Sequence, residues 1–397
     1  MGRASALGGP TAGGGTDRAC PVGMQILVLN TGSSSVKYDL YDGDGAEPRR
    51  LDGGTIDRLE GGDAVDRAIG QIFDKLATES LSAIGHRVVH GGTQLVAPAV
   101  IDDATEAAIE ACSQFAPLHN PLNLRGIRAA RKRFPKLPHV AVFDTAFHAT
   151  LSPAAFLYGL PYALYEDHGF RRFGFHGPSH RYLAERVSAE LGGDPKAHRL
   201  ITCHLGSGAS LAAIAGGASI DTSMGLTPLE GLVMATRPGD LDPAIPGLLR
   251  ARGYTDEQLA DLLSHHAGLA GISGLGADIR DLEAAADRGH ARARLALDVF
   301  VHRVRKYLGA YLVELGGCDA LAFAGGVGEG SAGLRARICA GLAGLGIALD
   351  PKRNPAAAPA KHGGLAEITL SGSRTRSFVV HTEEELVIAR DVAAALA

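Results

Sequence analysis

Two stretches of the chain repeat one pattern, in which an apolar strand is followed by a turn rich in glycine and serine and then by a second strand. Residues 25–42 read Q-I-L-V-L-N-T-G-S-S-S-V-K-Y-D-L-Y-D, and residues 200–214 read L-I-T-C-H-L-G-S-G-A-S-L-A-A-I. Short apolar runs bounded by such turns are typical of β-strands. Because the two copies lie about 170 residues apart, they predict a duplicated core whose halves each present a hairpin turn toward a shared cleft.

The segments between these units show helical patterns with recognisable start and stop signals. Prolines in the first turn, and a glycine pair or a proline at the end, predict helices over residues 120–134 and 177–192. Apolar residues spaced three and four apart predict one long helix over residues 281–315. Strands that alternate with helices indicate an α/β fold with at least one mixed sheet in each half.

Composition limits the kinds of partner. The 397 residues are 46% hydrophobic, enough for two domains with apolar cores, and the net charge is -4 without long basic runs. This balance offers no attraction for nucleic acid or an anionic membrane surface, and no apolar stretch approaches the length of a membrane span. Five scattered cysteines without a C-x-x-C pair predict reduced thiols in a cytoplasmic protein. Small molecules are therefore the expected partners.

The first 23 residues differ from the rest of the chain. They are rich in glycine and alanine, lack the apolar core of a secretory signal, and stop just before Met24, where the first strand pattern begins. We expect residues 1–23 to be a disordered tail or an incorrectly assigned start, with translation beginning near Met24.

Three glycine-rich turns follow apolar runs and offer backbone N–H groups to an anion. The turn from Asn30 to Ser35 carries three serine hydroxyls, and it fits either a phosphate cradle or a plain polar hairpin turn. A second turn covers residues 206–210, and the run F-A-G-G-V-G-E-G-S over residues 323–331 predicts a third glycine-rich loop. Together they resemble the nucleotide cleft of the acetate and sugar kinase, Hsp70 and actin superfamily. None is a P-loop, since G-x-x-x-x-G-K-[ST] is absent.

Two arginines are candidates for binding a small carboxylate. In the run I-G-H-R-V-V-H-G-G, strand alternation puts Arg87 and Val89 on the same face, where a guanidinium beside a small apolar wall fits a short carboxylic acid. A structural salt bridge explains a strand arginine equally well. Arg237 lies in a loop bounded by proline and glycine, from which it could supply a second guanidinium.

Two histidines and several carboxylates complete the candidates. His119 and His176 each stand just before a predicted helix start, where a phosphoryl oxygen is favoured, although a lone histidine is more often structural. Asp144 ends the strand H-V-A-V-F, a position from which a carboxylate either holds Mg²⁺ through water or caps a turn. Residues 383–385 are three glutamates before a C-terminal helix, as the helix dipole alone would favour.

Seven strings occur in one order along the chain: H-R-V-V-H-G-G, A-P-L-H-N-P, V-F-D-T-A-F-H, G-F-H-G-P-S-H, H-L-G-S-G-A-S, T-P-L-E-G-L-V-M-A-T-R and E-E-L-x-I-A-R. Together they resemble the acetokinase family, and the similarity runs from Met24 to nearly the C-terminus. The resemblance implies an α/β, two-domain actin-like ATPase (ribonuclease H-like) fold with a duplicated βββαβαβα core. It implies an N-terminal acyl-binding lobe of residues 24–147 plus 386–397 and a C-terminal nucleotide-binding and dimerisation lobe of residues 148–385.

The resemblance also implies an activity: reversible, direct in-line transfer of the ATP γ-phosphoryl group to acetate, which gives acetyl phosphate and ADP. Mg²⁺, or Mn²⁺ in its place, would be the cofactor, and the protein would be a cytoplasmic homodimer that serves acetyl-CoA biosynthesis. The implied catalytic residues are Asp144, Arg87, Arg237, His176, His119 and Asn30, and the implied metal site is Asn30, Asp144 and Glu384. The implied acetate pocket is Arg87, Val89, Leu118, Phe175 and Pro228. The implied nucleotide-binding residues are Ser33, Ser35, Lys37, His204, Gly206, Ser207, Gly208, Asp278, Arg280, Gly326, Gly328, Glu329 and Gly330.

The chain departs from the family's strings at four positions. Ser207, Gly330 and Glu383 stand where the family has asparagines, and Pro178 stands where it has threonine or serine. Proline fits the first turn of a helix, so Pro178 changes little. Ser207 and Gly330 lie on the nucleotide side, where the loss of two amides removes hydrogen bonds to phosphate or ribose. A different phosphoryl donor is therefore an alternative to ATP.

Acetate is already ionised at neutral pH, since carboxyl pKa values lie near about 4, so its phosphorylation needs no general base. We expect Arg87 and Arg237 to neutralise the two anions, and His176 and Asn30 to orient the transferring group. Propionate or butyrate kinase is an alternative that differs in pocket size, and a pocket of four bulky apolar residues predicts a preference for acetate. A sugar kinase would need a catalytic carboxylate, and an actin- or Hsp70-like ATPase would need a further binding module.

Overall fold

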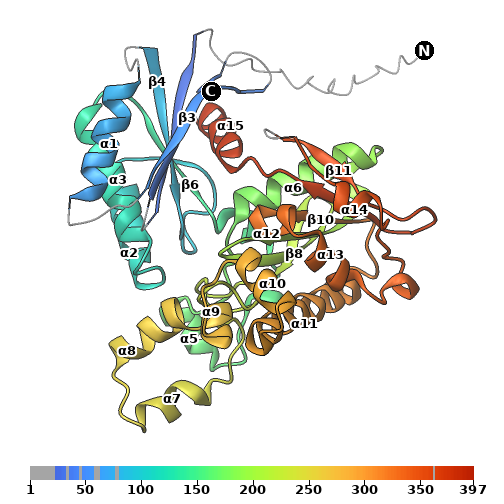
Figure 1. The fold of residues 1–397 in the computed structure, drawn as a ribbon. Helices are drawn as coiled ribbons and strands as arrows, with labels where there is room; N and C mark the ends of the chain where they lie inside the picture. The colour runs from blue at the N-terminus through green and yellow to red at the C-terminus, as the bar shows by residue number, and fades with distance from the viewer. Residues whose placement is uncertain (1–22, 33–34, 44–46, 58–62, 77–79, 361–362) are drawn as a thin grey trace, which may run out of the picture.

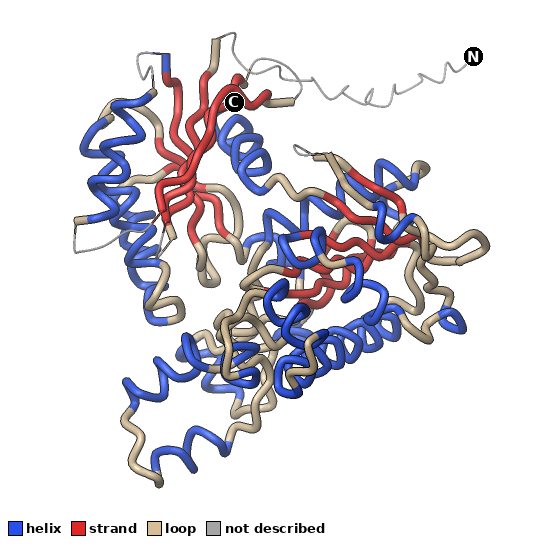
Figure 2. The backbone as a smooth tube through the Cα atoms, in the orientation of Figure 1, coloured by secondary structure: helices blue, strands red, loops and turns tan. Residues whose placement is uncertain are grey.

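Two six-stranded sheets organise the protein in a computed structural model, which describes residues 23–32, 35–43, 47–57, 63–76, 80–360 and 363–397. Figure 2 shows the two sheets in red, each flanked by helices, with the first sheet above and to one side of the second. Each sheet has its own apolar core, as the duplicated sequence pattern predicts.

The first sheet has the strand order β3-β2-β1-β4-β6-β5. Strands β1, β2 and β3 form antiparallel pairs, whereas β4 and β6 run parallel to β1. The β1–β2 pair is the first hairpin predicted from the sequence. The strands are β1 (Gln25–Thr31), β2 (Ser35–Asp42), β3 (Arg49–Asp57), β4 (Leu81–Val88), β5 (Ala99–Val100) and β6 (His139–Phe143).

The second sheet repeats this arrangement strand for strand, with the order β9-β8-β7-β10-β12-β11. Strands β7, β8 and β9 are antiparallel, β10 and β12 run parallel to β7, and β11 closes the edge antiparallel to β12. This correspondence confirms the predicted duplication. The strands are β7 (Arg199–Leu205), β8 (Ala209–Ala215), β9 (Ala218–Thr222), β10 (Ala320–Ala324), β11 (Leu365–Glu367) and β12 (Arg376–Val380).

Helices cover both faces of the first sheet. Alternate residues of β1 point to opposite faces, so Leu27 and Leu29 pack with helices α1 (Ala64–Lys75) and α3 (Asn120–Arg133), whereas Ile26 and Val28 pack with α15 (Glu384–Leu396). The C-terminal helix therefore returns to the sheet in which the chain starts, as Figure 1 shows in red.

The second sheet is covered by α6 (Gly177–Leu191) on one face and by the long helix α11 (Ala291–Glu314) on the other. The predicted helices over 120–134 and 177–192 are thus confirmed. The remaining helices are α2 (Asp103–Ala111), α4 (Pro153–Phe156), α5 (Tyr162–His168), α7 (Ala244–Arg250), α8 (Asp256–Asp261), α9 (Gly268–Ser273), α10 (Ile279–Asp287), α12 (Gly325–Gly330), α13 (Ala332–Cys339) and α14 (Arg353–Ala356), with single 3-10 or π turns at Cys112–Gln114, Ala146–Thr150, Pro195–Ala197, Leu262–His266 and Ala343–Leu345.

Two sequence-based expectations differ from the structure. The single helix predicted over 281–315 is two helices, because Gly289 has φ +89° and the His290 side chain accepts a hydrogen bond from Ala293 N–H, which starts α11 afresh. The glycine-rich run predicted as a loop after β10 is the short helix α12. The buried guanidinium of Arg335 donates to the carbonyls of Gly328 and Glu329 at 2.8 Å each, which satisfies carbonyls at its C-terminal end.

The described cysteines Cys112, Cys203, Cys318 and Cys339 are buried free thiols, as predicted, and Cys20 lies outside the described residues. Among the helices of the described chain, none combines the length and apolar character needed to cross a membrane. The expectation of a tail and a start near Met24 concerns residues 1–23, of which residues 1–22 lie outside the described part.

Candidate active site

Arg87, Asp144 and Asn30 meet at the ends of three neighbouring strands of the first sheet. Arg87 donates from Nε to Asp144 Oδ1 at 2.8 Å and from Nη2 to Oδ2 at 2.6 Å, and its Nη1 donates to Asn30 Oδ1 at 3.2 Å. The guanidinium fork that the sequence suggested for a substrate carboxylate thus binds Asp144, whose side chain is 2% exposed. Burial alone would lower the pKa of Arg87. The charges of Asp144 and Glu384 have a larger effect in the opposite direction, so the pKa of Arg87 is raised.

Two glutamates at the start of α15 add negative charge beside this cluster. Glu385 accepts from Lys37 Nζ at 2.7 Å and from Asn30 Nδ2 at 3.4 Å, so its charge is balanced. Burial raises the pKa of Glu384 to about 7; Arg87 opposes the shift, and the charges of Glu385 and Asp144 add to it. Glu384 is therefore a buried carboxylate with too little positive charge around it.

Arg237, in contrast, is a positive charge with too little negative charge around it. Within the described chain no carboxylate lies within ion-pair distance of it, and its Nη1 donates only to the carbonyl of Pro228, at 2.8 Å. Burial lowers the pKa of Arg237 to about 10. A Cβ atom on Gly208 would lie 2.7 Å from Arg237 Nη2, so the glycine leaves this nitrogen room beside the β7–β8 turn. A buried guanidinium without a counter-charge is a site at which an anion would bind favourably.

His176 lies next to Arg237, at the start of α6. It is the only non-glycine residue among those described that has positive φ, at 57°, which marks a strained backbone. The Gly177 N–H that follows it donates to the carbonyl of Asp144 at 2.9 Å and so ties α6 to the end of β6. The His176 ring stacks on His204 with centroids 4.3 Å apart. Burial and the neighbouring imidazoles lower the pKa of His176 well below the ordinary value, so the ring is neutral at pH 7.

His119 precedes α3 and lies near Arg237 and Arg87, whose charges act on it. Asn120 donates from Nδ2 to the carbonyl of His90 at 2.9 Å, which holds the start of α3 against the chain that follows Arg87. Burial, together with the charges of Arg237 and Arg87, lowers the pKa of His119 to about 4. The predicted catalytic residues of both halves are therefore brought together.

The predicted acyl pocket is only partly assembled. Val89 and Phe175 are buried in one cluster, Pro228 is partly buried, and Leu118 is 46% exposed. Behind them stands His90, fully buried, whose ring lies 5.5 Å from that of Phe175. Its Nδ1 accepts from Gly92 N–H at 3.0 Å, so its Nε2–H is the donor to the carbonyl of Leu226 at 3.3 Å.

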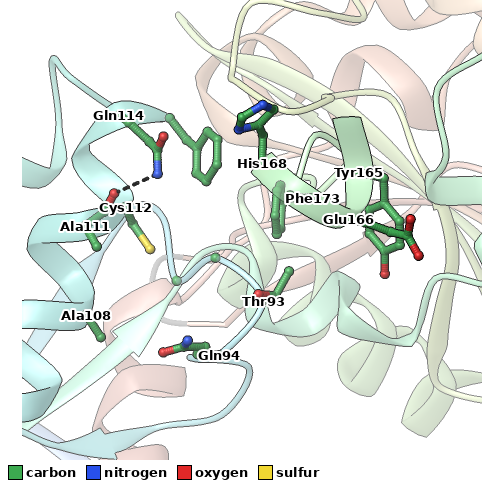
Figure 3. A pocket seen from close by; sticks show the side chains of 14 residues that line it. Thr93, Gln94, Ala108, Ala111, Cys112, Gln114, Tyr165, Glu166, His168 and Phe173 are labelled. Carbon is green, nitrogen blue, oxygen red and sulfur yellow. Dashed lines mark hydrogen bonds between the residues drawn. The ribbon is translucent and has the colours of Figure 1, made fainter. Parts of the chain in front are cut away.

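A separate cavity of about 500 Å³ lies on the far side of His90. Figure 3 shows side chains of Thr93, Gln94, Cys112, Tyr165 and Phe173 around it, contributed by both halves of the protein. The His90 ring stands between Phe173, which lines this cavity, and Phe175. The cavity is therefore distinct from the cluster of Arg87, Arg237 and the two histidines.

The predicted nucleotide residues fall into three groups. Gly206, Ser207 and Gly208 form the β7–β8 turn, which packs against α12, and α12 contains Gly326, Gly328, Glu329 and Gly330. Glu329 is engaged within the protein, since it accepts from Gly325 N–H at 3.2 Å and bonds His381 at 2.8 Å. Asp278 and Arg280 pair with each other on the exposed start of α10. On the first sheet, Ser35 opens β2 and Ser33 lies outside the described residues.

Several residues that support the site are not evident from the sequence pattern. Glu230 accepts from Arg172 Nη2 at 2.6 Å and from the Tyr158 hydroxyl, and so anchors the loop that carries Pro228 and Arg237. His180, Ser210 and Thr202 form a hydrogen-bonded chain that ends on His176. His180 lies four residues after His176, a spacing that puts both on one face of a helix and was the one readable signal.

The duplicated sheets, with polar side chains at the ends of their parallel strands, define the class of this protein: the acetate and sugar kinase, Hsp70 and actin superfamily. Residues 60–390 match the Acetokinase family. The chain belongs to the acetokinase family.

The similarity covers nearly the whole chain. The acetate kinase of Treponema denticola is 44% identical over 94% of this chain and 99% of its own length, and that of Leifsonia xyli subsp. xyli is 47% identical over 94% and 99%. Among solved structures, the acetate kinase of Porphyromonas gingivalis has a TM-score of 0.85 at 37% identity over 94% of this chain and 100% of its own. A propionate kinase from Francisella tularensis has a TM-score of 0.84 at 36% identity over 94% and 99%.

Proposed function

We propose that this protein is an acetate kinase, which transfers the γ-phosphoryl group of ATP reversibly to the carboxylate of acetate by direct in-line displacement. The observation that carries this proposal is the buried guanidinium of Arg237, which has no carboxylate partner in the described chain and lies beside a neutral His176 and the glycine turn. Such a site binds an anion whose charge the protein itself does not balance.

The reaction joins two anions, so the main task of the protein is electrostatic. Acetate needs no general base, because its carboxyl pKa lies near about 4. Arg237 would bind the anionic oxygens directly. Arg87, whose fork binds Asp144, would add positive charge at the edge of the site, where its side chain is 19% exposed. His176 and His119 are neutral and would orient the phosphoryl oxygens without adding charge.

We assign the nucleotide to the side of the second sheet, at the β7–β8 turn and the N-terminal end of α12. The lobe of residues 148–385 would bind ATP and form the dimer, and the lobe of residues 24–147 plus 386–397 would bind the acyl group. Backbone N–H groups at glycine turns and helix starts favour phosphate oxygens. His204, which stacks on His176, lies between this turn and Glu384.

The residues at the end of the first sheet fit a divalent cation. Asp144, Glu384 and Asn30 supply the oxygen ligands that Mg²⁺ prefers, and the raised pKa of Glu384 indicates that added positive charge would be favourable there. Mg²⁺, or Mn²⁺ in its place, would neutralise charge on the β- and γ-phosphates when bound. Asp144, which Arg87 holds with two hydrogen bonds, and Glu384 would position it.

Acetate is proposed as the preferred acid because Val89 and Phe175 are buried in one apolar cluster. Together they would form a wall that leaves little room beside the acyl group. Propionate kinase is the second candidate, because the exposed Leu118 leaves one side of that wall open. One methylene typically changes specificity by roughly tenfold to a hundredfold.

We further propose a homodimer in the cytoplasm that serves acetyl-CoA biosynthesis, on the strength of family membership. Helix α7 has no buried residues, and its Leu248 and the nearby Tyr254 are 54% and 43% exposed, which supports a partner surface on the second lobe. Light scattering at micromolar concentration would give the oligomeric state.

Hydroxylamine trapping of acyl phosphate tests the activity. Formate, acetate, propionate and butyrate would be offered with ATP, GTP and pyrophosphate, and acetate with ATP should give the highest kcat/KM. ADP release from ATP without any acid, and with glucose, would measure the ATPase and sugar kinase alternatives. Equal or higher kcat/KM for propionate would favour the second candidate, and no hydroxamate from any acid would refute the proposal.

A further inference from the structure

Four side chains form a linear hydrogen-bonded chain behind the candidate active site. Thr202 Oγ1 lies 2.8 Å from His180 Nδ1, His180 Nε2 lies 2.8 Å from Ser210 Oγ, and Ser210 Oγ lies 2.8 Å from His176 Nδ1. Thr202 and Ser210 stand on adjacent strands β7 and β8, and both histidines belong to the start of α6. Thr202, His180 and Ser210 are fully buried, so water does not compete for these bonds.

The direction of donation along this chain follows from its far end. A neutral imidazole carries one donor and one acceptor nitrogen. Thr202 Oγ1 has no second partner in the part of the chain that the structure describes. If His180 Nδ1 carried the hydrogen, the buried hydroxyl hydrogen of Thr202 would be left without an acceptor, which disfavours that arrangement by roughly tenfold or more.

The hydroxyl of Thr202 therefore donates to His180 Nδ1, and the remaining hydrogens follow in order. The hydrogen of His180 is on Nε2 and is donated to Ser210 Oγ. Ser210 then donates its own hydrogen to His176 Nδ1, so the hydrogen of His176 is on Nε2. This ring nitrogen is the one that faces the candidate site.

Nε2 of His176 and Nη2 of Arg237 both border the small space beside Gly208. A Cβ atom on Gly208 would be 3.2 Å from the first nitrogen and 2.7 Å from the second. We propose that Thr202, His180 and Ser210 are positioning residues that hold His176 as the Nε2–H tautomer, a ready donor to the oxygens of the transferring phosphoryl group. The part of this proposal that concerns the phosphoryl group rests on the proposed function, whereas the tautomer itself does not.

The tautomer is measured on the full-length protein without substrate. Ring nitrogens of ¹⁵N-histidine-labelled protein would be recorded by long-range ¹H–¹⁵N NMR, with His176→Gln used to assign the signals. We expect His176 to show a protonated Nε2 and an unprotonated Nδ1. A protonated Nδ1 in the wild type would overturn the proposal. Since no turnover is required, this result stands even if no carboxylic acid proves to be a substrate.

Variants then test the chain. Thr202→Val should give a mixture of His176 tautomers and lower kcat in proportion to the lost Nε2–H form, about twofold for an even mixture, with KM for acetate unchanged, and Thr202→Ser should restore both the tautomer and kcat. Ser210→Ala should lower kcat in the same way. Thr375→Val removes another buried hydroxyl, which donates to the Cys318 carbonyl at 2.8 Å, and should leave the tautomer and kcat unchanged. If Thr202→Val folds poorly, the pair Thr202→Ser and Ser210→Ala carries the test. An unchanged tautomer and kcat in Ser210→Ala would refute the proposal.

Discussion

Replacing Arg237 by methionine should make the protein more stable and nearly inactive, whereas the same change at Arg87 should make it both less stable and inactive. A pKa lowered from 12.5 to about 10 corresponds to about 3 kcal/mol of unfavourable burial of the charged Arg237. Methionine removes the charge and keeps much of the volume, and the lost hydrogen bond to Pro228 costs about 1 kcal/mol. The free energy of unfolding should therefore rise by about 2 kcal/mol.

Arg87 differs because it has a buried partner. Arg87→Met leaves the carboxylate of Asp144, which is 2% exposed, without its two hydrogen bonds, and breaking such a pair costs about 3 to 5 kcal/mol. The structural salt bridge that the sequence left open for Arg87 is therefore present and stabilises the fold, whereas Arg237 has no carboxylate partner in the described chain.

Urea unfolding at pH 7.5 and hydroxamate formation on the same preparations would decide the matter. Turnover should fall roughly a hundredfold to a thousandfold in both variants. Arg294→Met is the matched control, since this exposed arginine also donates to a backbone carbonyl, and it should change neither the free energy of unfolding nor turnover. A loss of stability in Arg237→Met similar to that in Arg87→Met would refute the argument that its charge is buried at a cost.

Three further outcomes are expected. Val89→Ala should widen the acyl wall and raise kcat/KM for propionate relative to acetate by roughly tenfold, measured as hydroxamate formation; an unchanged ratio would remove Val89 from the pocket. Burial lowers the pKa of His148 to about 4, so the unfolded chain binds a proton below pH 6.5 that the folded protein does not. Between pH 7 and pH 5 the free energy of unfolding, measured with urea, should fall by about 2 kcal/mol more in the wild type than in His148→Gln, and equal losses in the two proteins would contradict this. EDTA should reduce turnover to background and added Mg²⁺ should restore it, whereas turnover that persists in EDTA would exclude the metal role assigned to Asp144 and Glu384.

Local signals in the sequence were sufficient for much of the fold. The two hairpins follow from apolar runs around glycine and serine, and the starts of α3 and α6 follow from their prolines. The break between α10 and α11 was missed, since one helix was predicted there, although Gly289 followed by His290 is a signal for a helix end and a new cap. The helical form of α12 was not, since it depends on Arg335, which lies outside the glycine run and reaches back to its carbonyls.

The sequence indicated which residues belong to the site, but not which of them bond to each other. The register between β4 and β6 determines which carboxylate pairs with the guanidinium of Arg87. Neither strand's sequence alone specifies this register. The missing counter-charge of Arg237 is likewise a property of everything packed around it. The exposure of Leu118 depends on how the chain before α3 is placed, which no local pattern specifies.

The return of α15 to the first sheet has a consequence for how the protein is made. Ile26 and Val28, near the start of the described chain, share a core with Ile388 and Val392, near its end. During synthesis, one face of β1 stays uncovered until α15 has left the ribosome, although the strands beside it are available much earlier. The first lobe is thus expected to complete its folding only once α15 has been made, and to depend on chaperones or on slow elongation more than the second lobe does.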